Sequence, residues 1–194
     1  MGRHAEVERT TNETAVRLVV SLDGKGRAEV TTGIPFLDHM LSLMAMQAMF
    51  DVNIRATGDL SVDYHHTVED VGIALGQGLR KALGDLKGIR RFGEATVPMD
   101  EALSSVVVDI SGRPVLIYRV EATGKILDFD AGLAESFLKA LVDHAGITMH
   151  VNLWYGKDLH HVIESIFKGL GRALDQATAV DERRTGVPST KGTL

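Results

Sequence analysis

Two segments of the sequence carry the same chemically useful pattern, a pair of adjacent histidines with a glutamate three positions after the second one. On a helix, side chains three or four positions apart share a face, whereas adjacent side chains diverge by about 100°. Each segment therefore offers two diverging imidazoles with a carboxylate between them. Two such segments could build two metal sites, each with one histidine from each segment. The donors are His65, His66, Glu69, His160, His161 and Glu164.

A single histidine pair is more often a solvated helix start than a metal site, but two copies at matched positions favour metal binding. His39, in FLDHML, is the next candidate, and the matching residue in the second half is Ser136, a poor ligand. Gln47 is matched by His144, which lies eight positions after Ser136 and on roughly the same helix face. His144 is therefore the alternative ligand for the position that Ser136 occupies.

The donor types narrow the choice of metal. Nitrogen and carboxylate ligands suit Mn²⁺, Fe²⁺ or Zn²⁺ and disfavour Ca²⁺ and Mg²⁺. We expect Mn²⁺, because several histidines with carboxylates and free positions suit a six-coordinate ion, although this donor set also admits zinc. The chain has no cysteine, which excludes thiolate zinc sites, disulfides and cysteine nucleophiles.

Basic and hydroxyl residues form a second group with a chemical use. Arg91 lies in GIRRFG, Arg113 follows Ser111-Gly112, and residues 189–191 read Ser-Thr-Lys. A planar guanidinium, an ammonium group and hydroxyls are what a phosphate monoester site requires. The sequence contains no glycine-rich phosphate loop and no dinucleotide fingerprint.

The elements that position these residues form an internal repeat. Residues 63–83 and 158–178 are identical at eight of 21 positions, at a shift of 95 residues. Each half predicts two strands, a helix, a strand and a second helix, which indicates an α+β protein with helices on one face of each sheet. The expected elements are strands 16–22, 28–32 and 52–56 with helices 36–50 and 66–83, then strands 103–110, 115–120 and 147–153 with helices near 130–144 and 160–177.

These elements divide the chain into a first ββαβα half at 1–93, a second at 94–178 that forms one unit with it, and a mobile polar tail at 179–194. The 194 residues are 44% apolar and 24% charged, an ordinary globular composition. A net charge of −5 argues against a nucleic-acid binder. No segment is long and apolar enough to span a membrane and the first residues carry no apolar signal core, so we expect a cytoplasmic protein.

Several motifs, in order along nearly the whole chain, resemble the imidazoleglycerol-phosphate dehydratase family of histidine biosynthesis. They are FLDHML (36–41), DYHHTVED (63–70), GIRRFG (88–93), PMDEAL (98–103), SGRP (111–114), HHVIESIFK (160–168) and PSTKG (188–192). The resemblance implies a duplicated fold similar to domain 2 of ribosomal protein S5. It also implies a shell of 24 subunits, with active sites between subunits that contain two Mn²⁺ ions bound to the imidazole ring of the substrate.

The implied reaction is that of a hydro-lyase, a carbon–oxygen lyase. It converts D-erythro-1-(imidazol-4-yl)glycerol 3-phosphate to 3-(imidazol-4-yl)-2-oxopropyl phosphate and water, the sixth step of the pathway. The tail would close over the substrate. The family often has histidine where Gln47 and Ser136 stand, so Gln47 could bind substrate but not act as an acid or base.

The resemblance also assigns roles to residues. The metal positions are His39, His65, His66, Glu69, His160, His161 and Glu164, with His144 as the alternative in place of Ser136. The substrate positions are Glu13, His39, Gln47, His65, Arg91, Arg113, Ser189, Thr190 and Lys191. The candidates for proton transfer are Glu13, Glu69 and Glu164.

Two other classes of protein compete with a lyase. A metal-dependent hydrolase could use the same donors to activate water, but the sequence has no HExxH motif. A metal-storage shell could bury histidine and glutamate, but it would have no need of Arg113 or Lys191. Turnover of the imidazole phosphate distinguishes the lyase from both.

Overall fold

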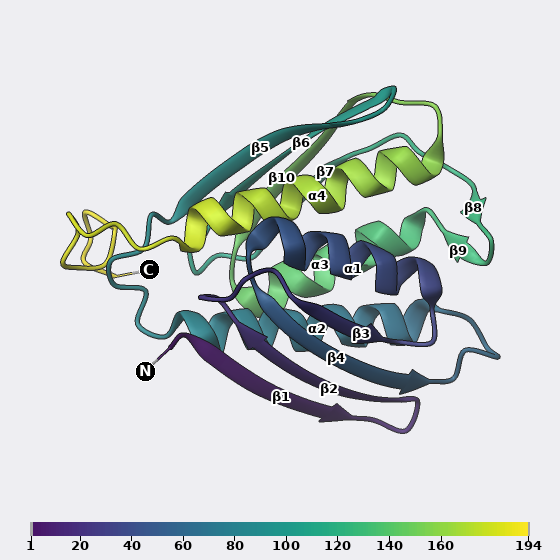
Figure 1. Cartoon of the computed structure of the whole chain (residues 1–194), viewed down its shortest axis with the longest axis horizontal. Coiled ribbons are helices and arrows are strands. Elements are labelled where there is room, and N and C mark those ends of the chain that lie inside the picture. Colours follow the sequence, from purple (N-terminus) through teal and green to yellow (C-terminus); the bar gives the residue numbers. More distant parts are fainter. Residues whose placement is uncertain (1, 194) are drawn as a thin grey trace.

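Two four-stranded sheets enclose two layers of helices in the computed structural model, which describes residues 2–193 (Figure 1). The first set of elements is β1 (His4–Thr10), β2 (Thr14–Ser21), β3 (Ala28–Thr31), α1 (Pro35–Ala48), β4 (Asp51–Gly58) and α2 (His65–Leu83). The second set is β5 (Phe92–Met99), β6 (Ala102–Asp109), β7 (Val115–Arg119), β8 (Lys125–Ile126), β9 (Phe129–Asp130), α3 (Gly132–Ala145), β10 (Thr148–Tyr155) and α4 (Leu159–Thr178).

The two large sheets have the same topology, as expected for two halves related by an internal sequence repeat. Their strand orders are β1-β2-β4-β3 and β5-β6-β10-β7. In each sheet the first three strands are antiparallel, and the last strand, β3 or β7, runs parallel to its neighbour. The α+β class predicted from the sequence is therefore confirmed.

The predicted ββαβα order lacked the first strand of each half. β1 and β5 are edge strands, and an edge strand with one face toward solvent needs few apolar residues. β1 buries only Ala5 and Val7, and β5 contains Gly93 and Pro98, both unfavourable in a strand interior. The β8–β9 hairpin was also not predicted, because each of its strands has only two residues.

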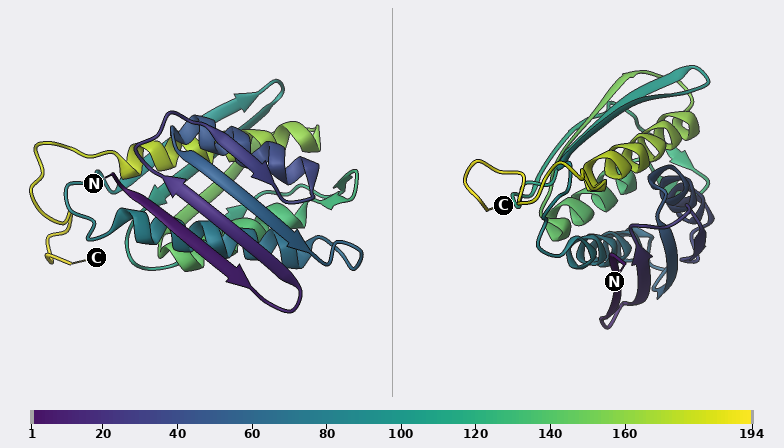
Figure 2. Two further views of the ribbon diagram at one scale, coloured as in Figure 1. Left: turned by 60° about the horizontal axis from the view of Figure 1, so that its bottom comes forward. Right: turned by 60° about the vertical axis from the view of Figure 1, so that its left-hand side comes forward.

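Along each large sheet, buried and exposed side chains alternate, and the helices cover the buried face. In β2, residues 14, 16, 18 and 20 are buried and the residues between them are exposed. Helices α1 and α2 lie on the first sheet and α3 and α4 on the second, so that the sheets are outermost and the helices lie between them (Figure 2).

The two halves meet through their helices, α1 against α4 and α2 against α3. Glycine makes both contacts close. A Cβ atom on Gly171 of α4 would lie 2.7 Å from Gln47 Cβ in α1, and one on Gly76 of α2 would lie 2.9 Å from His144 Cβ in α3. These equivalent contacts confirm the matching of Gln47 with His144.

Among residues 2–193, no helix combines the length and the apolar character that crossing a membrane requires.

Candidate functional site

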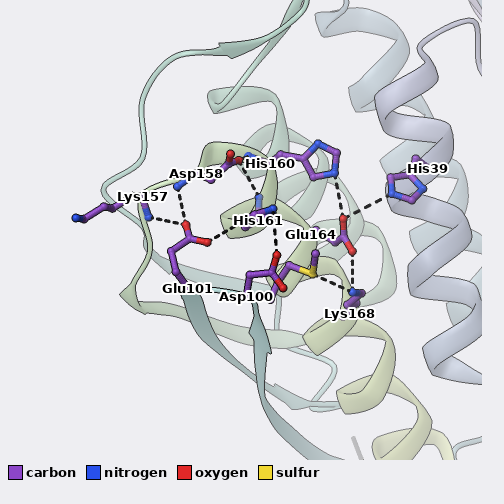
Figure 3. Close-up of polar contacts among 10 residues, drawn as sticks. His39, Asp100, Glu101, Lys157, Asp158, His160, His161, Glu164 and Lys168 are labelled. Carbon is purple, nitrogen blue, oxygen red and sulfur yellow. Dashed lines mark hydrogen bonds and ion pairs between the residues drawn. The ribbon is translucent and has the colours of Figure 1, made fainter.

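Three of the predicted metal ligands converge where the first turns of α1 and α4 meet. Glu164 Oε2 lies 3.1 Å from His160 Nε2 and 3.6 Å from His39 Nε2. The two imidazoles point toward this carboxylate from different helices (Figure 3). Phe36 packs edge-on against the His160 ring, with 5.2 Å between ring centroids. His39, His160 and Glu164 form a triad. These residues are far apart in the sequence and come together because α1 packs on α4.

Glu164 is buried, and a lysine on the same helix neutralises it. Burial raises the pKa of Glu164, but Lys168 and the two histidines outweigh burial and leave it below its ordinary value. Lys168 Nζ lies 2.7 Å from Glu164 Oε1, the oxygen that does not face the histidines. The carboxylate is therefore ionised at neutral pH and keeps Oε2 available to a cation.

The donor set of the triad fits a transition-metal ion. Bonds of about 2.1 Å to nitrogen and oxygen place neighbouring ligands roughly 3 Å apart around the ion. The His39, His160 and Glu164 donor atoms all lie within 4.8 Å of one another. Within the described residues this is the one group of three such donors that meets that limit.

The equivalent place in the other half has only two of the three donors. His65 Nε2 lies 3.9 Å from Glu69 Oε2 at the start of α2. Ser136 of α3 takes the place of His39, and its hydroxyl donates to the Gly132 carbonyl oxygen of its own helix at 3.2 Å. The alternative ligand, His144, does not lie here: it is at the other end of α3, where its Nδ1 contacts the Ala140 carbonyl oxygen at 2.9 Å.

The second histidine of each pair contacts a carboxylate that lies outside its helix. His66 Nδ1 lies 3.0 Å from Asp59 Oδ2, and His161 Nδ1 lies 2.7 Å from Glu101 Oε2. These hydrogen bonds raise the pKa of both histidines. Hydrogen bonds from the Asp158 backbone N–H, from His161 and from the Lys157 backbone N–H lower the pKa of Glu101 to about 2.

The predicted phosphate residues line a cavity of about 720 Å³ at the opposite end of the molecule. The Arg91 side chain is largely buried and is held by Asp109, while the Arg113 side chain is exposed. Four positively charged side chains at one cavity suit a phosphate. The lining residues are Arg91, Arg113, Arg184, Val187, Pro188, Ser189, Thr190, Lys191 and Thr193.

The first part of the predicted tail is bonded to the segment before β5. Asp181 N–H donates to the Gly88 carbonyl oxygen at 2.8 Å, and Gly88 N–H donates to the Gly186 carbonyl oxygen at 3.1 Å. The Pro188 carbonyl oxygen accepts from Arg91 Nη1 at 2.9 Å. These bonds place residues 189–191 beside Arg91 and Arg113.

The metal candidates and the phosphate candidates lie at opposite ends of α4. This helix begins beside the triad and ends at the tail (Figure 1). Its 20 residues span about 30 Å at 1.5 Å per residue. Residues 189–191 therefore cannot reach a molecule bound to His160 of the same chain without a large rearrangement.

Glu13 and Gln47 belong to neither the triad nor the cavity. Glu13 is in the β1–β2 turn, and its Oε2 lies 3.7 Å from His66 Nδ1, beyond hydrogen-bond distance. Gln47 is at the end of α1, against Gly171. The structure thus brings His39, His160 and Glu164 together, places Glu13 near His66, and leaves Gln47 in a helix contact.

Sequence reasoning missed five residues that touch these groups. Glu101 lies in PMDEAL and Asp109 lies two positions before SGRP, but no spacing rule connects them to His161 or Arg91. Lys168 could have been found, because it is four positions after Glu164 and therefore on the same helix face. The five are Asp59, Glu101, Asp109, Lys168 and Arg184.

The chain matches proteins of known function over its full length. The sequence profile of the imidazoleglycerol-phosphate dehydratase family matches residues 32–174. Relatives of that name from Pelobacter propionicus and Geobacter sulfurreducens are 53% and 54% identical over 195 residues, covering 100% of both chains in each case.

Solved structures of imidazoleglycerol-phosphate dehydratase share the fold. The Pyrococcus furiosus enzyme, in complex with (S)-C348, has a TM-score of 0.85 and 38% identity and covers 97% of this chain and 100% of its own. The Staphylococcus aureus enzyme has a TM-score of 0.83 and 38% identity, covering 92% and 99%.

The fold and these matches define the class of protein: a hydro-lyase built on a duplicated α+β fold. The chain belongs to the imidazoleglycerol-phosphate dehydratase family, EC 4.2.1.19. Its reaction is the dehydration step of histidine biosynthesis.

Proposed function

We propose that this protein is a cytoplasmic enzyme that converts D-erythro-1-(imidazol-4-yl)glycerol 3-phosphate to 3-(imidazol-4-yl)-2-oxopropyl phosphate in a site with two Mn²⁺ ions. The observation that supports this most directly is the convergence of His39, His160 and Glu164, with a cationic cavity formed separately. An imidazole and a phosphate at the two ends of one substrate match these two kinds of group.

The proposed metal ligands are the triad together with the donors of the first half and the second histidine of each pair. When bound, Mn²⁺ supplies Lewis acidity at the imidazole ring of the substrate. The ring can then accept electrons, which matters because the substrate has no carbonyl to acidify the carbon-bound proton. The full set is His39, His65, His66, Glu69, His160, His161 and Glu164.

The reaction breaks one C–O bond and one C–H bond on adjacent carbons. The hydroxyl leaves from the carbon attached to the ring, and the proton leaves from the next carbon. The resulting enol takes up a proton at the ring-attached carbon and becomes the ketone of the product. A group that accepts and returns a proton near the ring is therefore needed.

Glu13 is the best candidate for this proton transfer. Its carboxylate makes no side-chain hydrogen bond within the described part of the chain, whereas Glu164 bonds to Lys168 and His160. Glu69 faces His65 and Glu164 faces two histidines, so both are better suited to hold an ion. Glu13 lies at the same end of the molecule and remains available.

We propose that each active site combines two chains. Arg91, Arg113 and residues 189–191 would hold the phosphate of a substrate whose ring is bound at the metal end of another copy. A three-carbon chain between ring and phosphate cannot span the length of α4. A closed shell of 24 subunits would present the tail of one chain to the triad of its neighbour.

The test is turnover of imidazole-glycerol phosphate by metal-stripped protein before and after addition of Mn²⁺, with bound metal counted per chain. Activity restored by manganese at close to two ions per chain is expected. Activity with one ion per chain would show that the site with Ser136 is weak or empty. No turnover despite full metal loading would overturn the proposal and favour a hydrolase or a storage shell.

A further inference from the structure

The bonds made by the second histidine of each pair fix which ring nitrogen carries the proton. An ionised carboxylate can only accept, so His161 Nδ1, 2.7 Å from Glu101 Oε2, must be the donor. In the neutral ring, Nε2 is then unprotonated and able to bind a metal ion. Asp59, 3.0 Å from His66 Nδ1, imposes the same arrangement in the other half.

Glu101 and Glu13 occupy corresponding places in the two halves, each immediately before the second strand of its sheet. They nevertheless make different contacts. Glu101 Oε1 accepts from the backbone N–H groups of Lys157 and Asp158 at 3.1 and 2.8 Å, while Oε2 contacts His161 (Figure 3). Glu13 Oε2 stays 3.7 Å from His66.

Asp59 accounts for this difference, because it occupies the histidine nitrogen that Glu13 would otherwise bind. Its Oδ2 makes the bond to His66, and its Oδ1 is buried without a hydrogen-bond partner among the described residues. The Asp59 carboxylate thus performs in the first half what Glu101 performs in the second. Glu13 is left without a positioning role.

We propose that Glu101 and Asp59 are positioning residues that hold His161 and His66 as the tautomers with unprotonated Nε2, and that Asp59 thereby frees Glu13 for proton transfer. The inference rests on the proposed function, since it concerns ligands of the proposed Mn²⁺ sites. Neither residue is among the proposed metal ligands or substrate positions; each acts through the histidine that it contacts. Outer-shell partners of this kind change metal affinity by about 10- to 100-fold when removed.

Replacement of Glu101 by glutamine separates this role from a merely structural one. The amide oxygen of Gln can still accept from Lys157 and Asp158 N–H, so the loop before α4 stays anchored. The amide nitrogen then faces His161 Nδ1 and can only donate. His161 must accept at Nδ1 and carry its proton on Nε2, which blocks the metal-binding nitrogen.

The experiment measures Mn²⁺ affinity of the assembled protein by electron paramagnetic resonance of the free ion, together with thermal unfolding of the metal-free protein. Glu101→Gln and Asp59→Ala should each weaken Mn²⁺ binding by about 10- to 100-fold, with little change in unfolding temperature for Glu101→Gln. Glu13→Gln should keep wild-type affinity and lose kcat. Glu94→Gln, which removes the same charge from an exposed position on β5, is the control.

The outcomes separate this inference from the proposed function. The positioning role would be overturned if Glu101→Gln bound Mn²⁺ with wild-type affinity, or lost no more affinity than Glu94→Gln. In that case the wild-type protein would still bind Mn²⁺ and convert the substrate, so the proposed function would stand. Weakened Mn²⁺ binding in Glu13→Gln would contradict the assignment of positioning to Asp59 and proton transfer to Glu13. Failure of the wild-type protein to bind Mn²⁺ would instead refute the proposed function.

Discussion

Asp109 binds the guanidinium of Arg91 through both carboxylate oxygens: Oδ1 accepts from Nε at 2.7 Å and Oδ2 accepts from Nη2 at 3.1 Å. The third nitrogen, Nη1, donates to the Pro188 carbonyl oxygen. Arg91 also has a left-handed backbone, with φ of 78°, a conformation that L-residues seldom adopt. The surroundings therefore fix both the backbone and the side chain of this arginine at the cavity.

Asp109→Asn should weaken substrate binding more than the chemical step. An amide can replace only one of the two accepting oxygens, so the Arg91 fork loses its fixed orientation. We expect KM for imidazole-glycerol phosphate to rise by about tenfold, the effect of losing one charge-assisted bond, with a smaller change in kcat. Steady-state kinetics and metal counting check this. An unchanged KM, or a fall in bound metal, would contradict it.

Lys191→Ala should raise KM strongly and leave metal content unchanged. Lys191 lines the cavity and lies at the far end of α4 from the triad. Its ammonium would contact the phosphate and not the ions. Steady-state kinetics and metal analysis of the same variant test this prediction. Loss of metal from the variant would show that the tail contributes to metal binding as well as to phosphate binding.

Mixing two impaired variants should restore activity at low substrate concentration if each site uses two chains. His160→Ala removes a triad ligand, and Lys191→Ala damages the cavity at the other end. In assemblies re-formed from an equal mixture, roughly a quarter of the sites would take an intact triad and an intact cavity from different chains. Recovered turnover after joint dissociation and reassembly is the readout. A mixture no more active than its two components would mean that a site belongs to one chain.

Ser136→His should complete the incomplete donor set of the first half. Ser136 is matched to His39, and His65 Nε2 and Glu69 Oε2 already lie 3.9 Å apart. A third donor should tighten Mn²⁺ binding there. Titration of metal-free protein with Mn²⁺ measures it. Unchanged affinity and stoichiometry would indicate that another ligand already serves this position.

Gly171→Ala should lower both stability and Mn²⁺ affinity. The added Cβ would meet the Met44 carbonyl oxygen and lie 2.7 Å from Gln47 Cβ, so α1 must move away from α4. Overpacking of this kind costs about 1–3 kcal/mol, and the movement separates His39 from Glu164. Thermal unfolding and Mn²⁺ titration report the two effects. Gly186→Ala, at a position with nothing within 4 Å, is the control and should change neither.

The sequence predicted the helices better than the strands, and it pointed to the triad residues but not to the residues that contact them. α1, α2 and α4 were predicted within two residues because apolar periodicity and the repeated histidine pairs mark them. The contact between Glu101 and His161 could not be predicted, since it depends on the β5–β6 turn meeting the start of α4. Nor does any local pattern show that the triad and the cavity lie at opposite ends of α4.

Under the proposed function, the packing of α1 on α4 would link metal supply to folding. His39 and Glu164 come together only after α1 has docked on α4, so the unfolded chain has no comparable site. An ion that binds only the folded state stabilises it by about 2.7 kcal/mol at a hundred times its dissociation constant. Manganese shortage would then act on the amount of folded protein as well as on turnover, and proteases would remove chains left without metal sooner than loaded ones.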